Sequence, residues 1–94
     1  MIENDIETYF TRQVKKRGAL CYKFTSPGNR AVPDRIVLFS GRTFFIELKR
    51  PGGKPRKDQL KKFKDFSRQN IHVYVIDTKD GVDQFIKKMT SEKE

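Results

Sequence analysis

The strongest structural signal in this chain is carried by residues 33–39 (Pro-Asp-Arg-Ile-Val-Leu-Phe) and residues 45–49 (Phe-Ile-Glu-Leu-Lys). Both are apolar runs of strand length with charged residues at one end. Side chains two residues apart in a strand lie on the same face, so Glu47 and Lys49 emerge together. Asp34, at the start of the other run, would add a second carboxylate. Charges in apolar surroundings must be paired or bind a metal, so the pattern predicts a charged site at the edge of an apolar sheet.

Two carboxylates beside a lysine favour one kind of chemistry. Carboxylate oxygens suit a hard divalent cation such as Mg²⁺ or Mn²⁺, and a nearby ammonium group can orient or polarise a water molecule. Taken alone, Asp34 after a proline is also typical of a turn, and Glu47 with Lys49 is typical of an ion pair on an exposed edge strand. The apolar neighbours of Glu47 indicate a strand buried on both faces, which favours a phosphodiester-cleaving site over these alternatives.

The composition predicts one small domain. The chain has 94 residues, of which 35% are hydrophobic, so we expect a single thin core over residues 1–90 and a frayed tail over 91–94. A single cysteine excludes an intrachain disulfide and favours a reducing, intracellular setting. The sequence contains no secretory signal and no apolar run of membrane-spanning length. We therefore expect a cytoplasmic protein that does not bind membranes.

The charge distribution predicts a polyanionic partner. The formal net charge is +9 and the isoelectric point is about 9.9. Residues 49–64 contain eight basic residues and only one acidic residue, Asp58. The first ten residues, by contrast, contain Glu3, Asp5 and Glu7 and no basic residue. This unevenness indicates a local role for negative charge within a basic protein.

The periodicity of apolar residues predicts seven elements in the order α-β-β-β-α-β-α. The expected helices cover 2–17, 56–69 and 80–89, and the expected strands cover 20–24, 34–39, 43–49 and 72–76. Ser40-Gly41-Arg42 is a plausible tight connection between the second and third strands. A hairpin followed by one helical crossover implies an α/β protein with a mixed β-sheet flanked by helices.

The helix expected at 56–69 separates into two faces. One is a basic stripe formed by Lys57, Lys61, Lys64 and Arg68, and the other is an apolar face formed by Leu60, Phe63 and Phe66. Gln59 falls on the apolar face, where a polar amide needs a partner. That partner could be a backbone carbonyl, Lys49 or an attacking water molecule.

The first helix supplies further carboxylates. Glu3 and Glu7 lie on the same face as the apolar residues Ile6, Phe10 and Val14. Acidic residues in a first turn also favour the helix dipole, which is sufficient to explain one of them. The functional alternative is a carboxylate directed towards Asp34 and Glu47.

Several of these motifs together resemble a known family. The segments 32–35 (Val-Pro-Asp-Arg), 46–49 (Ile-Glu-Leu-Lys) and 51–55 (Pro-Gly-Gly-Lys-Pro), followed by Gln59, resemble the VRR-NUC domain of the PD-(D/E)XK nuclease superfamily. The resemblance runs from the first helix through the strand at 72–76. It is to the short, free-standing phage or bacterial members, so it implies a bacterial or phage-infected host cell.

The resemblance implies a restriction-endonuclease-like fold and assigns roles to individual residues. Asp34 and Glu47 would be metal ligands, Lys49 the catalytic lysine and Gln59 a further polar residue of the active site. The family's first-helix glutamate precedes an apolar residue by three positions, which fits Glu3 and leaves Glu7 as the second choice. Mg²⁺ or Mn²⁺ would be held by these carboxylates, with the Leu48 carbonyl as an extra ligand.

The expected function is metal-dependent, structure-selective DNA endonuclease activity at four-way (Holliday) junctions in repair or recombination, carried out by a homodimer. DNA phosphates would be held by six basic residues: Arg30, Arg35, Lys54, Arg56, Lys57 and Lys61. Two alternatives remain open at this point. One is a general or nicking endonuclease, and the other is a non-catalytic nucleic-acid-binding module of the same fold.

Overall fold

The computed structural model describes residues 3–91, and the backbone alone of residues 3 and 4. The three helices are α1 (Glu3–Lys16), α2 (Lys57–Arg68) and α3 (Lys79–Ser91). The four strands are β1 (Leu20–Lys23), β2 (Arg35–Phe39), β3 (Arg42–Leu48) and β4 (Val73–Ile76). This is the element order that the sequence predicts, and the predicted mixed α/β architecture is confirmed.

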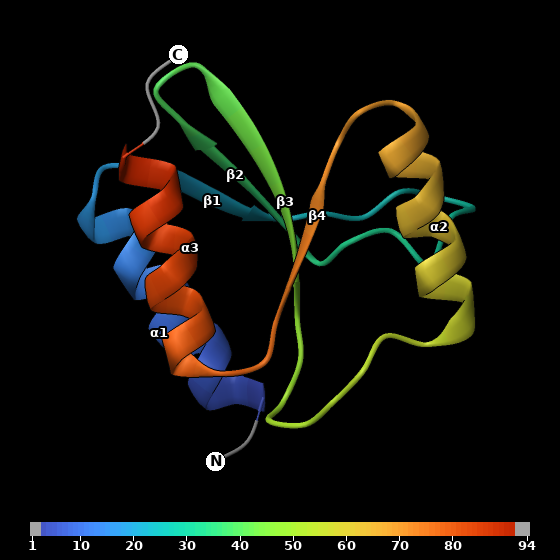
Figure 1. Ribbon diagram of the computed structural model, residues 1–94, viewed down its shortest axis with the longest axis horizontal. Helices are drawn as coiled ribbons and strands as arrows, with labels where there is room; N and C mark the ends of the chain where they lie inside the picture. The colour runs from blue at the N-terminus through green and yellow to red at the C-terminus, as the bar shows by residue number, and fades with distance from the viewer. Residues whose placement is uncertain (1–2, 92–94) are drawn as a thin grey trace.

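The strands form a single sheet in the order β1-β2-β3-β4. The β1–β2 and β2–β3 pairs are antiparallel, whereas β3 and β4 are parallel and are connected through α2. Figure 1 shows α1 and α3 together on one face of the sheet and α2 on the other. The molecule therefore has three layers, with the sheet in the middle.

Alternation along β3 divides the side chains between the two outer layers. Phe44, Ile46 and Leu48 are buried in the main core, which they share with α1 and α3. Phe45 and Glu47 point to the opposite face, where Phe45 packs edge-on against Phe66 of α2 with ring centroids 5.2 Å apart. Because Glu47 shares the face of Phe45, its carboxylate lies in the layer covered by α2.

The α2 layer is thinner than the sequence predicts. Leu60, expected on the buried face of this helix, is 50% exposed, and Phe63 and Phe66 are only partly buried. The buried residue of α2 is Gln59, which is 4% exposed. The helix is therefore attached to the sheet by a polar contact at its N-terminal end as well as by aromatic packing.

The element boundaries differ from expectation by only one or two residues. Ser40 (φ 52°) and Gly41 (φ 80°) both adopt the left-handed conformation, which is typical of a two-residue hairpin turn, so β3 begins at Arg42. Ser91, assigned above to the tail, is the last residue of α3, and residues 92–94 lie outside the described part. Within residues 3–91, no helix has the length and apolar character needed to cross a membrane.

Candidate active site

Strand register brings the two predicted carboxylates together. Arg35 pairs with Ile46 in the antiparallel β2–β3 ladder, so Asp34 lies opposite Glu47. The backbone N–H of Asp34 donates to Glu47 Oε1 (3.2 Å), and the N–H of Leu48 donates to Asp34 Oδ2 (3.1 Å). The Asp34 carbonyl also accepts a hydrogen bond from Phe24 (2.8 Å), which fixes the backbone at this position.

Lys49 and Gln59 complete the cluster. The Nζ atom of Lys49 lies 3.0 Å from Glu47 Oε2 and donates to Gln59 Oε1 at 3.1 Å. Gln59 Nε2 in turn donates to Glu47 Oε2 at 2.7 Å. The three side chains therefore form a closed ring of charged and polar contacts next to Asp34.

Gln59 has a second role, at the start of α2. Its Oε1 atom also accepts a hydrogen bond from the backbone N–H of Arg56 (2.9 Å), one of the N–H groups that a helix leaves unpaired at its N-terminus. The same amide thus stabilises the helix start and positions Lys49. Of the partners considered from the sequence, Lys49 is the one observed among the described residues.

Burial dominates the electrostatics of Glu47. Its side chain is 1% exposed, and this loss of solvent raises the pKa of the carboxyl above its usual value of 4.5. The charge of Asp34 raises the pKa of Glu47 further, whereas the hydrogen bonds from Lys49 and Gln59 lower it. The pKa of Glu47 is therefore higher in the folded protein than in the unfolded chain. Its contribution to the free energy of unfolding is present at low pH and is lost as the pH rises through the folded-state pKa.

The donor set fits a hard divalent cation. Asp34 and Glu47 provide oxygen ligands, and no described residue donates a hydrogen bond to Asp34 Oδ1. A cation would also relieve the cost of an ionised Glu47. Within the described side chains there is no group of three or more potential metal ligands, and the expected third carboxylate, that of Glu3, lies outside them.

Glu7, the second choice for that ligand, has a different partner. Its Oε2 atom accepts a hydrogen bond from Arg35 Nη2 at 2.6 Å, on the α1 side of the sheet. The Arg35 side chain is only 11% exposed, and its Nε atom is buried without a hydrogen-bond partner among the described residues. This placement does not support the expected role of Arg35 in phosphate binding.

The other predicted phosphate-binding residues are accessible. Arg30 (85% exposed) and Arg56 (51% exposed) both contact Asp58, at 4.0 and 3.1 Å. Lys54, Lys57 and Lys61 are also exposed. These five residues belong to α2 and to the loops that precede β2 and α2.

Asp77 is a further residue at the site that the sequence did not single out. Asp77 Oδ2 accepts a hydrogen bond from the N–H of Gly52 (3.1 Å), and the N–H of Gly53 donates to the Arg50 carbonyl (2.8 Å), which closes a turn just after Lys49. Asp77 follows β4 at the end of the sheet where Lys49 follows β3, because the two strands are parallel. This pairing is a tertiary feature that no local motif indicates.

Comparison with known proteins identifies the family of the chain. No family model matches the sequence, so the identification rests on one relative and one solved structure. The chain is 42% identical over 79 residues to "Putative nuclease p44" of Acyrthosiphon pisum secondary endosymbiont phage 1, an alignment that covers 83% of this chain and 85% of the phage protein. A solved structure described as a VRR-NUC domain superposes with a TM-score of 0.83 at 28% sequence identity and covers 90% of this chain and 94% of its own. A likeness of this extent in both sequence and fold means that the chain belongs to the VRR-NUC family.

Proposed function

We propose that this protein is a metal-dependent DNA endonuclease that hydrolyses phosphodiester bonds. The observation that carries the proposal is the ring of contacts among Glu47, Lys49 and Gln59, to which Asp34 is joined by the hydrogen bond from its backbone N–H to Glu47. The phage relative carries the name "Putative nuclease p44", which supports the same class of reaction. The net charge of +9 fits a nucleic-acid substrate.

Asp34 and Glu47 would hold Mg²⁺ or Mn²⁺, together with the Leu48 carbonyl and Glu3. When bound, such an ion polarises the scissile phosphate and lowers the pKa of a water molecule. Lys49 is held by Glu47 and Gln59, so its ammonium group is fixed beside the carboxylates. From there it orients the attacking water and stabilises the negative charge that develops on the phosphate.

DNA binding would rely on the phosphate backbone. Five basic residues lie in or near the N-terminal half of α2, which also contains Gln59: Arg30, Lys54, Arg56, Lys57 and Lys61. Contacts of this kind provide affinity and register but read no base sequence. We therefore infer that the protein selects DNA by shape, with a four-way junction as the favoured substrate.

Cutting a four-way junction symmetrically requires two active sites. The described chain brings together one set of Asp34, Glu47 and Lys49, so a two-fold homodimer would supply the second. The two sites would then act on strands related by the same two-fold axis. In this proposal the homodimer is the active species.

The test is a cleavage assay on labelled DNA with Mg²⁺, using a four-way junction, a flap and a linear duplex. We expect the junction to be cut fastest, EDTA to stop the reaction and Mn²⁺ to restore it. Glu47→Ala and Lys49→Ala should each lower the rate by at least about 100-fold while junction binding survives. Lys88→Ala, an exposed change on α3, is the matched control. Full activity of the Glu47→Ala protein would refute the assignment, and equal cutting of all three DNAs would refute shape selection.

A further inference from the structure

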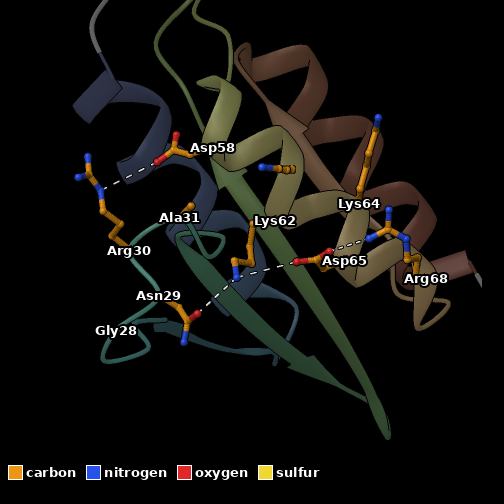
Figure 2. Close-up of a pocket in the computed structure, with 10 residues that line it drawn as sticks. Gly28, Asn29, Arg30, Ala31, Asp58, Lys62, Lys64, Asp65 and Arg68 are labelled. Carbon is orange, nitrogen blue, oxygen red and sulfur yellow. Dashed lines mark hydrogen bonds and ion pairs between the residues drawn. The ribbon is translucent and has the colours of Figure 1, made fainter.

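A pocket of about 360 Å³ lies between α2 and the loop that precedes β2. Its walls are the loop residues 28–31 and the face of α2 that carries Lys61, Lys62, Lys64 and Arg68. Figure 2 shows the two segments side by side, with Lys62 of α2 directed towards Asn29 of the loop and Arg30 of the loop directed towards Asp58 of α2. The pocket lies in the same layer of the molecule as Gln59 but extends towards the opposite end of the helix.

The pocket is positively charged and partly preorganised. Five basic and two acidic residues line it. Lys62 Nζ donates to the Asn29 side-chain oxygen at 3.3 Å and lies 4.0 Å from Asp65, which also accepts a hydrogen bond from Arg68 at 2.8 Å (Figure 2). The carboxylates therefore already have cationic partners. Lys61 and Lys64 contact no carboxylate among the described residues, so their charges remain available to a ligand.

We propose that this pocket binds phosphate groups of the DNA backbone away from the scissile bond. The inference rests on the proposed nuclease function and extends the contact region beyond Arg30 and Lys61, which also line the pocket. In this extension Lys62 and Lys64 bind phosphate, and Asn29 and Asp65 position Lys62. Side chains that are already held lose less conformational entropy on binding. The two acidic residues of the pocket, Asp58 and Asp65, are compatible with phosphate binding because each is paired with a basic residue of the pocket.

The length of α2 defines where this contact falls on the substrate. Arg68, at the far end of the pocket, lies nine positions after Gln59, at the proposed active site. At 1.5 Å per residue this corresponds to roughly 13 Å. In B-form DNA, with a rise of 3.4 Å per base pair, that distance is about four base pairs. The pocket would therefore contact an arm of the substrate beyond the cut site.

The experiment compares two charge-matched double variants of the full chain. Lys62→Gln with Lys64→Gln removes two charges from the pocket, and Lys87→Gln with Lys88→Gln removes two exposed charges from α3, in the opposite layer. Affinity for a labelled four-way junction is measured by fluorescence anisotropy in EDTA over a range of salt concentrations. The Lys64→Gln single variant, at an exposed position, serves if the double variant loses thermal stability.

We expect the pocket variant to bind at least about fivefold more weakly than the α3 variant at 0.1 M salt. We also expect its slope of log affinity against log salt to be smaller by about 2, because two phosphate contacts are lost. Equal affinity and equal slope for the two variants would overturn the inference while leaving the nuclease proposal intact. Absence of DNA binding by the unmodified protein would overturn both.

Discussion

Glu47 occupies the penultimate position of a central strand, where a charged side chain is costly. It is 1% exposed, and its two oxygens accept hydrogen bonds from the Asp34 backbone and from Gln59, with Lys49 at 3.0 Å. These partners offset part of the desolvation cost, although the pKa of Glu47 remains raised. A buried carboxylate that stays partly uncompensated is typical of a site that binds a cation.

The raised pKa of Glu47 leads to a prediction about pH. In the proposed mechanism, cleavage needs the ionised carboxylate, so the rate should fall as the pH is lowered through the raised pKa. Gln59→Ala removes a hydrogen bond that lowers this pKa. The acid limb of the pH–rate profile should therefore move to higher pH. The rate at neutral pH should fall by roughly 10- to 100-fold as Lys49 loses its second partner.

Gln69→Ala is the control for this measurement, because it makes the same change at an exposed position at the end of the same helix. Its pH–rate profile should match that of the unmodified protein. An unchanged acid limb for Gln59→Ala would show that Gln59 does not influence the titration of Glu47.

At the residue scale the sequence predicted the cluster but not all of its surroundings. Asp34, Glu47, Lys49 and Gln59 could be identified because each is a polar residue at a position where the pattern requires an apolar one or a turn. The ion pair between Glu7 and Arg35 could not be identified, because it depends on how α1 crosses the sheet. The exposure of Leu60 likewise depends on how little of α2 the sheet covers.

The segment between β3 and α2 is the element that positions Lys49, the proposed catalytic lysine. The N–H of Lys49 donates to the Ile76 carbonyl (2.9 Å), and the chain then turns at Gly52, which has a φ of 79° and is bound by Asp77. Glycine adopts this backbone conformation without the strain that a Cβ atom would add. The turn therefore fixes the direction in which the chain leaves Lys49.

Gly52→Ala tests this role. The substitution should lower the free energy of unfolding by about 1–2 kcal/mol, because a Cβ atom disfavours positive φ. It should also reduce the cleavage rate of the folded protein, because relaxing the turn displaces Lys49. Denaturant unfolding and the cleavage assay measure the two effects separately.

Gly41→Ala is the matched control. Gly41 has a nearly identical φ of 80° in the β2–β3 hairpin, and at neither glycine does an added Cβ meet a neighbouring atom. We expect the same loss of stability with no loss of activity. If both variants lose activity equally, the turn at Gly52 has no specific role in the site.

The elements themselves were largely predictable. The amphipathic period of α1 and α3 and the apolar runs of β2 and β3 are strong local signals, and their boundaries agree within two residues. The anchoring of the Gly52 turn by Asp77 was not predictable, because it depends on the parallel pairing of β3 with β4.

At the scale of the whole molecule, positive charge is concentrated in one layer. Helix α2 contains five basic and two acidic residues, and the loop before it adds four basic residues and no acidic one. Helix α3, in the opposite layer, contains three basic and two acidic residues. The proposed active-site residues Glu47, Lys49 and Gln59 lie in the α2 layer, so a polyanionic substrate would be attracted to the face that carries them.

The proposed homodimer can be tested on a supercoiled plasmid that extrudes a cruciform. A dimer with two sites should cut both strands during one binding event and produce linear DNA, whereas a single site would first accumulate nicked circles. Light scattering should give twice the chain mass of 11.1 kDa. Accumulation of nicked circles by a monomeric protein would rule out the dimer and favour a nicking enzyme.

The global arrangement followed from the sequence in part. A hairpin followed by a helical crossover implies a mixed sheet, and the short connections imply neighbouring strands. The sequence could not predict that Asp34 and Glu47 would face each other, because a shift of one residue in the register would place them on opposite faces. The observed pairing of Arg35 with Ile46 determines this.

The most direct test of a metal centre is calorimetric titration with Mn²⁺ of the unmodified protein and of the Asp34→Asn variant. The Asp65→Asn variant is the control, because it removes a carboxylate from the exposed surface of α2. We predict saturable binding of Mn²⁺ by the unmodified protein and by Asp65→Asn, and at least about tenfold weaker binding by Asp34→Asn. Equal Mn²⁺ affinity for all three proteins, or no binding by any of them, would contradict a metal centre built on Asp34 and Glu47.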